Sequence, residues 1–138
     1  PSLELGAFQH NGQAWQKISS YSQCLQDPCL RSGEIPDGGF SSALIMLFLP
    51  SDPRFKSNPL EGSRISFDVK VSSEECCDKL TFSISGTEMQ EWSGNIDWHR
   101  VEFDLPSIRP LLLEWNYRKS ESGSEGDDAA WLDRIVLE

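Results

Sequence analysis

Four stretches of the sequence alternate apolar and polar residues with a period of two, and this alternation is what most restricts the fold. They are residues 65–71, 80–84, 101–105 and 111–117. Successive side chains of a strand point to opposite faces of its sheet. Each stretch therefore predicts a strand with one face in a core and the other toward solvent. No stretch repeats apolar residues at the helical spacing of i, i+3, i+4 and i+7.

Less regular apolar stretches bring the expected total to about nine strands. Turn-forming residues separate them, as in residues 36–39 (PDGG) and 93–95 (SGN). Many short strands with such turns predict an all-β antiparallel sandwich of the jelly-roll type. The additional strands are expected at residues 3–5, 15–21, 41–49, 87–92 and 131–137.

The length of 138 residues fits one domain, so we expect a single β-sandwich module over residues 1–138. The chain opens on Pro1 and ends on a strand-like stretch at Glu138, which indicates a module cut from a larger protein. No stretch approaches the roughly 20 apolar residues of a membrane helix, so membrane insertion is not expected.

The charge of the chain restricts its partners. The formal net charge is −10, and the 12 Lys and Arg residues are scattered along the sequence. Nucleic-acid binding needs clustered basic residues, so nucleic acid is not an expected partner. An acidic surface suits solubility, Ca²⁺, or neutral partners such as sugars.

Four cysteines allow three disulfide pairings. Cys24 and Cys29 could form a local bridge around a turn. Cys76 and Cys77 could then bridge to each other, or each could reach across to the other loop. Their spacing matches no zinc pattern. Disulfides would place the protein in an oxidising compartment, so we expect it to be secreted or at a cell surface.

Catalytic signatures are absent from the sequence, and we expect no enzyme. Of the two histidines, His99 lies in an alternating stretch with Glu102 and Asp104, which predicts a surface histidine. No nucleophile–base pattern, metalloprotease motif or phosphate-binding loop occurs.

Acidic and aromatic residues supply candidate binding sites. A structural Ca²⁺ would take oxygen ligands from distant segments, with Glu4 and Asp133 as first candidates, and Asp127 and Asp128 in an acidic loop as others. Trp92 and Trp98 flank the turn at residue 94, so both are candidates for contact with a ligand. Trp115 continues an apolar alternation and is expected in the core, as are most of the five tryptophans.

Several segments in this order resemble a jelly-roll module that recurs in large secreted or cell-surface multidomain proteins and is similar to MAM-type and carbohydrate-binding sandwiches. The segments are 65–74 (ISFDVKVSSE), 77–82 (CDKLTF), 93–98 (SGNIDW), 113–119 (LEWNYRK) and 128–135 (DAAWLDRI). The resemblance covers residues 15–137 and is strongest from residue 65 onward. The chain departs from the pattern at Cys76-Cys77 and at the insertion 50–59.

The resemblance implies a non-catalytic binding module, with carbohydrate as the expected ligand. It also implies that Asp133 in the last strand ligates a structural Ca²⁺ with a partner from the first strand, such as Glu4. The alternative is a protein–protein adhesion or assembly module without a glycan ligand. In that case the apolar segment 50–60, which contains Phe55, would contact a neighbouring protein domain.

Overall fold

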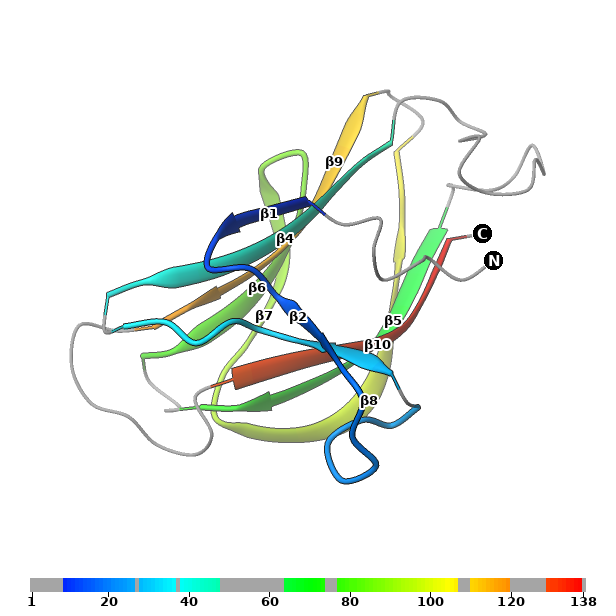
Figure 1. The fold of residues 1–138 in the computed structure, drawn as a ribbon. Helices are drawn as coiled ribbons and strands as arrows, with labels where there is room; N and C mark the ends of the chain where they lie inside the picture. Colours follow the sequence, from blue (N-terminus) through cyan, green and yellow to red (C-terminus); the bar gives the residue numbers. More distant parts are fainter. Residues whose placement is uncertain are drawn as a thin grey trace.

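The computed structural model shows a β-sandwich of ten strands in two antiparallel sheets (Figure 1). It describes residues 9–26, 28–36, 38–47, 64–73, 77–106, 110–119 and 129–137. One sheet has the order β1 (Gln9–Gly12), β4 (Phe40–Leu47), β9 (Leu111–Arg118), β6 (Lys79–Ile84) and β7 (Thr87–Trp92). The other has the order β2 (Gln16–Ile18), β3 (Cys29–Arg31), β10 (Ala129–Leu137), β5 (Arg64–Ser72) and β8 (Asn95–Asp104).

The strand order confirms the predicted jelly-roll sandwich. Strands β3 to β10 are divided between the sheets as β3-β10-β5-β8 in one and β4-β9-β6-β7 in the other, which is the jelly-roll arrangement of eight strands. The short strands β1 and β2 extend one edge of each sheet. In the described part of the chain, no helix is long and apolar enough to span a membrane.

The four alternating stretches became β5, β6, β8 and β9, and their apolar residues form the core. One alternate set of residues in β5 is fully buried, and so is the facing set in β9 that contains Trp115, as the sequence predicts. The predicted strand at 3–5 lies outside the described residues, and so does the insertion 50–59. Strands β1 and β3 were not expected, because each is too short to show an alternation.

An aromatic cluster at Phe67 joins the two sheets. The Phe67 ring lies 5.1 Å from Phe82, 5.5 Å from Trp115 and 6.0 Å from Phe103, measured between ring centroids. Two of these contacts are edge-to-face, the geometry that favours aromatic pairs. Burial of these rings between the sheets supplies much of the hydrophobic driving force for the fold.

The prediction that His99 is a surface histidine was wrong. His99 pairs with Val69 just as Val101 pairs with Phe67, so it lies on the inward side of β8 with Val101 and not on the side of Glu102 and Asp104. His99 is consequently half-buried, and its Nε2 accepts a hydrogen bond of 3.2 Å from Trp92 Nε1.

Substitution Phe67→Ala tests the importance of the aromatic cluster. It should lower the free energy of unfolding by about 3–5 kcal/mol, because it leaves a cavity between the sheets. Urea unfolding followed by tryptophan fluorescence measures this change. Met89→Ala on the edge strand β7 is the control, and it should change the free energy by less than about 0.5 kcal/mol because Met89 is exposed. Equal effects of the two substitutions would contradict this description of the core.

Candidate functional site

The outer face of the sheet β2-β3-β10-β5-β8 carries a row of aligned side chains. In the strand registers Gln16 pairs with Arg31, Arg31 with Trp131, and Trp131 with Lys70. These four residues come from four adjacent strands. Laterally paired residues point to the same face of a sheet, so the row runs across the outer face.

Trp131 lies at the centre of this row. The Arg31 guanidinium is 5.3 Å from the centre of the Trp131 ring, and the Lys70 ammonium is 5.0 Å from it. The two cations approach the indole from the strands on either side of β10, which is a favourable cation–π geometry. Trp131 Nε1 donates a hydrogen bond of 3.1 Å to Gln23 Oε1, and the residue is only 2% exposed.

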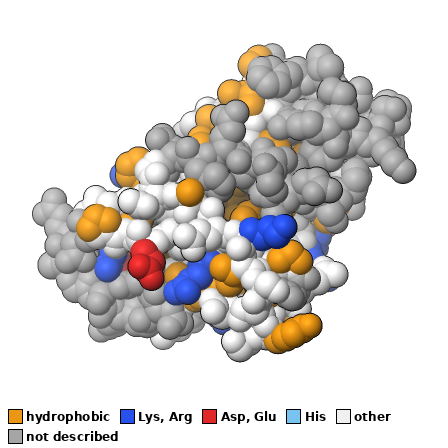
Figure 2. Space-filling model, in the orientation of Figure 1, with side chains coloured by type: hydrophobic (Ala, Val, Ile, Leu, Met, Phe, Trp, Pro, Cys, Tyr) orange, Lys and Arg blue, Asp and Glu red, His pale blue; other side chains and the backbone are white. Residues whose placement is uncertain are grey.

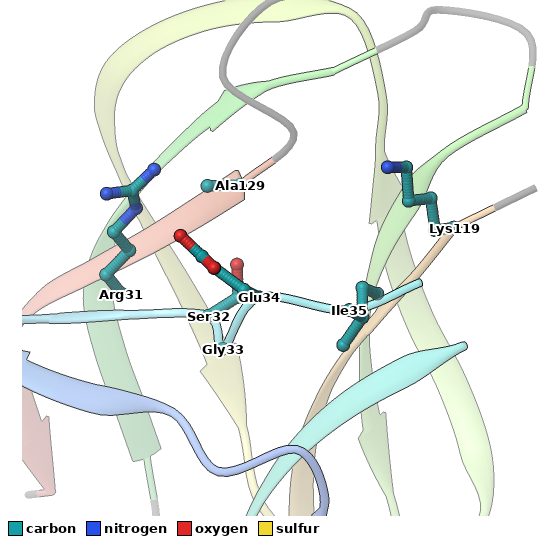
Figure 3. A pocket seen from close by; sticks show the side chains of 7 residues that line it. All are labelled: Arg31, Ser32, Gly33, Glu34, Ile35, Lys119 and Ala129. Carbon is teal, nitrogen blue, oxygen red and sulfur yellow. The ribbon is translucent and has the colours of Figure 1, made fainter. Parts of the chain in front are cut away.

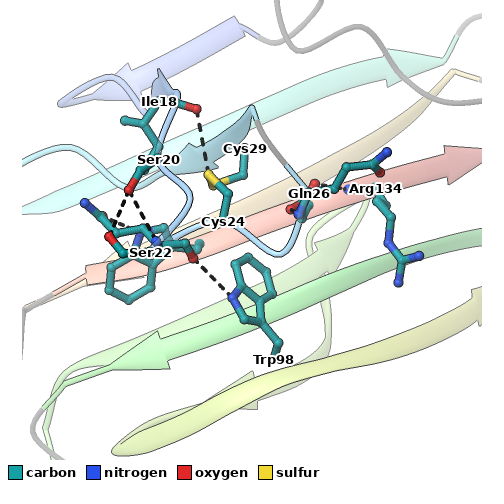
Figure 4. Close-up of a disulfide and its surroundings, with 11 residues drawn as sticks. Ile18, Ser20, Ser22, Cys24, Gln26, Cys29, Trp98 and Arg134 are labelled. Atoms are coloured by element: carbon teal, nitrogen blue, oxygen red, sulfur yellow. Dashed lines mark hydrogen bonds between the residues drawn. A yellow bond between two sulfur atoms is a disulfide. The ribbon is translucent and has the colours of Figure 1, made fainter.

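The β2–β3 loop (residues 19–28, of which the structure describes all but residue 27) covers part of this face (Figure 4). A disulfide joins Cys24 to Cys29 across a sequence separation of five residues. Cys29 is buried against Trp131, and Cys24 and Trp98 pack on the same small apolar cluster. Trp98 Nε1 also donates to the Gln23 carbonyl at 3.2 Å. The loop is therefore held to the sheet by the disulfide, the apolar cluster and tryptophan hydrogen bonds.

The most exposed large hydrophobic side chains of the described residues belong to this loop. Tyr21 is 95% exposed and Leu25 is 51% exposed. The backbone between them is fixed by a hydrogen bond from Cys24 N to Ser20 O at 2.9 Å. A well-supported loop thus presents an aromatic ring to solvent.

Three shallow pockets adjoin along the same face. The central pocket, of about 250 Å³, is lined by Ser22, Gln23, Arg31, Lys70 and Trp131. It shares Arg31 with a second pocket and Lys70 with a third.

The flanking pockets are of similar size. The second pocket, of about 250 Å³, lies along β3 and the segment that follows it, and it includes Glu34 and Lys119 (Figure 3). The third pocket, of about 270 Å³, lies between β5 and β8 and includes Asn95 and Asp97. Figure 2 shows Lys and Arg side chains (blue) gathered on this face, with little red among the described residues.

A group of charged side chains lies farther along the same face. The Asp68 carboxylate is buried and pairs with Arg100 at 3.3 Å and with Arg134 at 2.5 Å. Asp133 lies opposite Asp68 in the strand register. Its Oδ2 accepts a hydrogen bond of 2.6 Å from Gln26 N, and its Oδ1 accepts one of 2.8 Å from Arg134 N. Asp133 therefore ties the β2–β3 loop to β10.

Burial raises the pKa of Asp133 above the ordinary value of 3.8. The two backbone hydrogen bonds from Gln26 and Arg134 oppose this effect, and the nearby charge of Asp68 adds to it.

The two tryptophans predicted to contact a ligand differ in position. Trp98 is half-buried at the outer face, beside the β2–β3 loop. Trp92 belongs to the core, where it is 4% exposed and packs against Phe67 at 6.2 Å. Its ring is covered by other side chains, so the predicted ligand contact for Trp92 does not fit the structure. At the end of β7 the Trp92 side chain points toward the core. Its proximity to the turn at residue 94 does not predict this direction.

The structure describes only some of the residues that were predicted to bind a metal or to form disulfides. The Cys24–Cys29 bridge is the local pairing that the sequence allows. Cys77 is also disulfide-bonded, while Cys76 lies outside the described residues. Glu4 lies outside them too, so a Ca²⁺ site of Glu4 and Asp133 stays a prediction. Within the described ranges, no three His, Cys, Asp or Glu side chains come together as a metal site would require.

Tyr21, Arg31, Lys70 and Trp131 were missed as site residues. Tyr21 appears in the sequence as the end of an expected strand, and its exposure depends on the loop that the disulfide closes. Arg31 and Lys70 are 39 positions apart in the sequence numbering, and only the pairing of both strands with β10 brings them to one ring. No local pattern in the sequence signals that pairing.

Comparison with solved structures shows the fold class. No protein-family model and no curated protein sequence match the chain. The secreted serine protease VesC from Vibrio cholerae matches with a TM-score of 0.70 and 17% identity, over 95% of this chain and 24% of VesC. The K1 cleaved adhesin domain of Lys-gingipain from Porphyromonas gingivalis W83 matches with a TM-score of 0.64 and 12% identity, over 99% of this chain and 92% of that domain.

A carbohydrate-binding module is a third match. TmCBM61, solved in complex with β-1,4-galactotriose, has a TM-score of 0.63 and 14% identity, over 98% of this chain and 90% of that module. This chain has the fold of carbohydrate-binding modules and of accessory domains in secreted proteins. The resemblance read from the sequence is thereby confirmed at the level of the fold. The chain spans about a quarter of VesC, so it corresponds to one part of that protease.

Substitution Asp133→Asn tests the raised pKa of Asp133 through pH-dependent stability. The folded chain binds this proton more tightly than the unfolded chain, so the stability due to Asp133 is greatest below pH 3.8 and falls as the pH rises through the folded-state pKa. The amide of the variant cannot ionise. The free energy of unfolding of the native protein, relative to Asp133→Asn, should therefore decrease as the pH is raised from below 3.8 toward neutrality.

Urea unfolding of both proteins over this pH range measures the trend. Asp104→Asn, which removes an exposed carboxylate at the end of β8, is the control for the loss of one surface charge. A relative stability of the native protein that grows with pH would contradict the assignment.

Proposed function

We propose that this chain is a non-catalytic carbohydrate-binding module of a secreted or cell-surface multidomain protein. The observation that carries the proposal is Tyr21, an almost fully exposed aromatic ring on a disulfide-closed loop. The next two residues of that loop, Ser22 and Gln23, line the central pocket. The sugar would lie on the outer face of the sheet β2-β3-β10-β5-β8.

The chemistry of this surface suits a sugar. A pyranose ring presents an apolar face of C–H groups, which stacks on an aromatic ring, and hydroxyl groups that need hydrogen-bond partners. Ser22, Gln23, Arg31 and Lys70 supply donors and acceptors at the central pocket. The disulfide and the hydrogen bonds of the loop fix Tyr21's backbone before binding, which lowers the entropic cost of ordering the site.

The fold supports the proposal without naming the ligand. A module of the same fold was solved with β-1,4-galactotriose. Other matches are a secreted protease and an adhesin domain. Disulfides persist in oxidising compartments, so the Cys24–Cys29 bridge also agrees with a location outside the cytoplasm.

A protein–protein adhesion module is the second candidate. The adhesin domain of Lys-gingipain has this fold. Leu25 adds an exposed aliphatic side chain to the loop that carries Tyr21. The segment 50–60 with Phe55, predicted to contact a neighbouring domain, lies outside the described residues. The two candidates differ in what Tyr21 should bind.

A structural Ca²⁺ remains part of the proposal on the strength of the family resemblance. Asp133 would contribute a carboxylate oxygen and Glu4 a second. Both Asp133 oxygens already accept backbone hydrogen bonds, so the ion would share the carboxylate with the β2–β3 loop. Sugar binding should therefore be measured both with Ca²⁺ and with a chelator.

Substitution Tyr21→Ala tests the stacking role. It should weaken binding to the recognised polysaccharide by about fivefold or more, because one aromatic contact contributes on the order of 1 kcal/mol or more to such a site. Retention on a panel of immobilised polysaccharides, both neutral and acidic, identifies the ligand and measures the loss.

Met89→Ala provides the matched control for Tyr21→Ala, because Met89 is an exposed apolar side chain on β7 in the other sheet. It should leave retention unchanged. If the native protein is retained on no polysaccharide, with or without Ca²⁺, the proposed function is wrong and the adhesion candidate takes its place.

A further inference from the structure

We infer that the glycan bound by this module is acidic, with a carboxylate or sulfate group held between Arg31 and Lys70. The inference rests on the proposed function and goes further, because it gives the chemical class of the sugar. It comes from the central pocket, where both cations lie beside the same indole ring.

The two cations lie close together beside Trp131. Each is about 5 Å from the centre of the Trp131 ring, so they are at most about 10 Å apart, as expected for strands on either side of β10. Among the residues that the structure describes, no carboxylate forms an ion pair with Arg31 or Lys70. Two neighbouring like charges repel each other, and an anion between them removes that repulsion.

The other arginines of the same sheet are arranged differently. Arg100 and Arg134 both pair with the buried carboxylate of Asp68. Arg64 lies 3.4 Å from Asp104. Arg31 is thus distinguished from the other arginines of this sheet by its lack of an acidic partner among the described residues, a lack that Lys70 shares with Lys17 of β2.

Trp131 holds both cations in place before any ligand arrives. A half-buried Lys or Arg that lies over an indole loses rotamer freedom on folding, so that cost is not incurred again on binding. The indole is itself fixed by its hydrogen bond to Gln23 and by burial beneath the β2–β3 loop. The pocket is therefore a preorganised anion site with adjacent hydrogen-bonding groups.

The acidic side chains near this surface lie in the flanking pockets. Glu34 lines the pocket along β3, and Asp97 lines the pocket between β5 and β8, while the central pocket has no carboxylate among its described lining residues. An acidic glycan would place its charged group centrally. Its hydroxyl groups could then donate to Glu34 and Asp97 on either side.

The net charge of −10 makes this inference easy to test. An acidic chain repels polyanions in general, so it will not retain an acidic glycan through diffuse attraction. Retention of an acidic glycan must come from a local site, and salt should weaken it because both partners are charged.

The experiment measures binding of the full chain to immobilised polygalacturonate, heparin and neutral galactan by biolayer interferometry at several salt concentrations. Polygalacturonate carries carboxylates and heparin is also sulfated, so their relative affinities distinguish the two anions. We expect tighter binding to at least one of them than to galactan. Arg31→Gln and Lys70→Gln should each weaken that binding about tenfold, since each removes one charged hydrogen-bond donor.

The matched controls are Arg64→Gln and Lys79→Gln, which remove the same charges from residues that pair with Asp104 and Glu91 away from the pocket. They should leave binding unchanged, and an equal loss in these variants would overturn the inference. Lys70→Arg keeps the charge and should keep the binding. It therefore tests the site even if Lys70→Gln unfolds, and loss of binding by a folded Lys70→Arg also counts against the inference.

Two further outcomes separate this inference from the proposed function. In the first, the protein binds galactan through Tyr21, and Arg31→Gln and Lys70→Gln do not change this binding. That result would overturn the acidic ligand and leave the carbohydrate-binding function intact. Absence of binding to any glycan would overturn both. Polyglutamate bound as tightly as the acidic glycans would show that the pocket recognises charge without a sugar, which also overturns the inference.

Discussion

The pairing of β5 with β10 is the interaction on which the rest of this structure depends. Both strands lie inside their sheet, and both are buried on their two faces over most of their length. The inner face meets the aromatic core around Phe67. The outer face carries Asp68, Lys70, Trp131 and Asp133, which need either partners or cover because polar groups are costly to bury alone.

The outer face obtains its cover from the β2–β3 loop. The loop supplies a backbone donor to Asp133, a side-chain acceptor to Trp131 and the half-buried Cys24 to the small apolar cluster. The same contacts fix the backbone that presents Tyr21. One set of interactions therefore both covers β5 and β10 and presents an aromatic ring to solvent. The candidate binding site lies beside this loop, on the outer face of the sheet.

The sequence predicted the part of the fold that depends on local periodicity. The alternation in β5, β6, β8 and β9 gave the correct inner faces, because core burial imposes a period of two on a strand. The same alternation places His99 on the inner side of β8 with Val101 and Phe103, where its ring accepts a hydrogen bond from Trp92. The prediction of a surface histidine had grouped it with Glu102 and Asp104, which lie on the other face.

The candidate site could not be predicted from the sequence for a related reason. The turn between Trp92 and Trp98 predicts that both are exposed, yet exposure at a turn depends on what packs against it. Trp92 faces the core and Trp98 faces the loop. Arg31, Trp131 and Lys70 form one group only through pairing of three strands that are distant in the sequence. Strand register, which these local patterns do not encode, sets the chemistry of this surface.

The cations beside Trp131 also stabilise the fold. Each cation–π contact contributes roughly 0.5–1 kcal/mol at a partly exposed position. A neutral residue at 31 or 70 would lose that contribution, but an apolar side chain of similar length would cover the ring without bringing charge. Cover alone therefore does not require two positive charges beside one ring. The proposed anionic ligand would give them a common role.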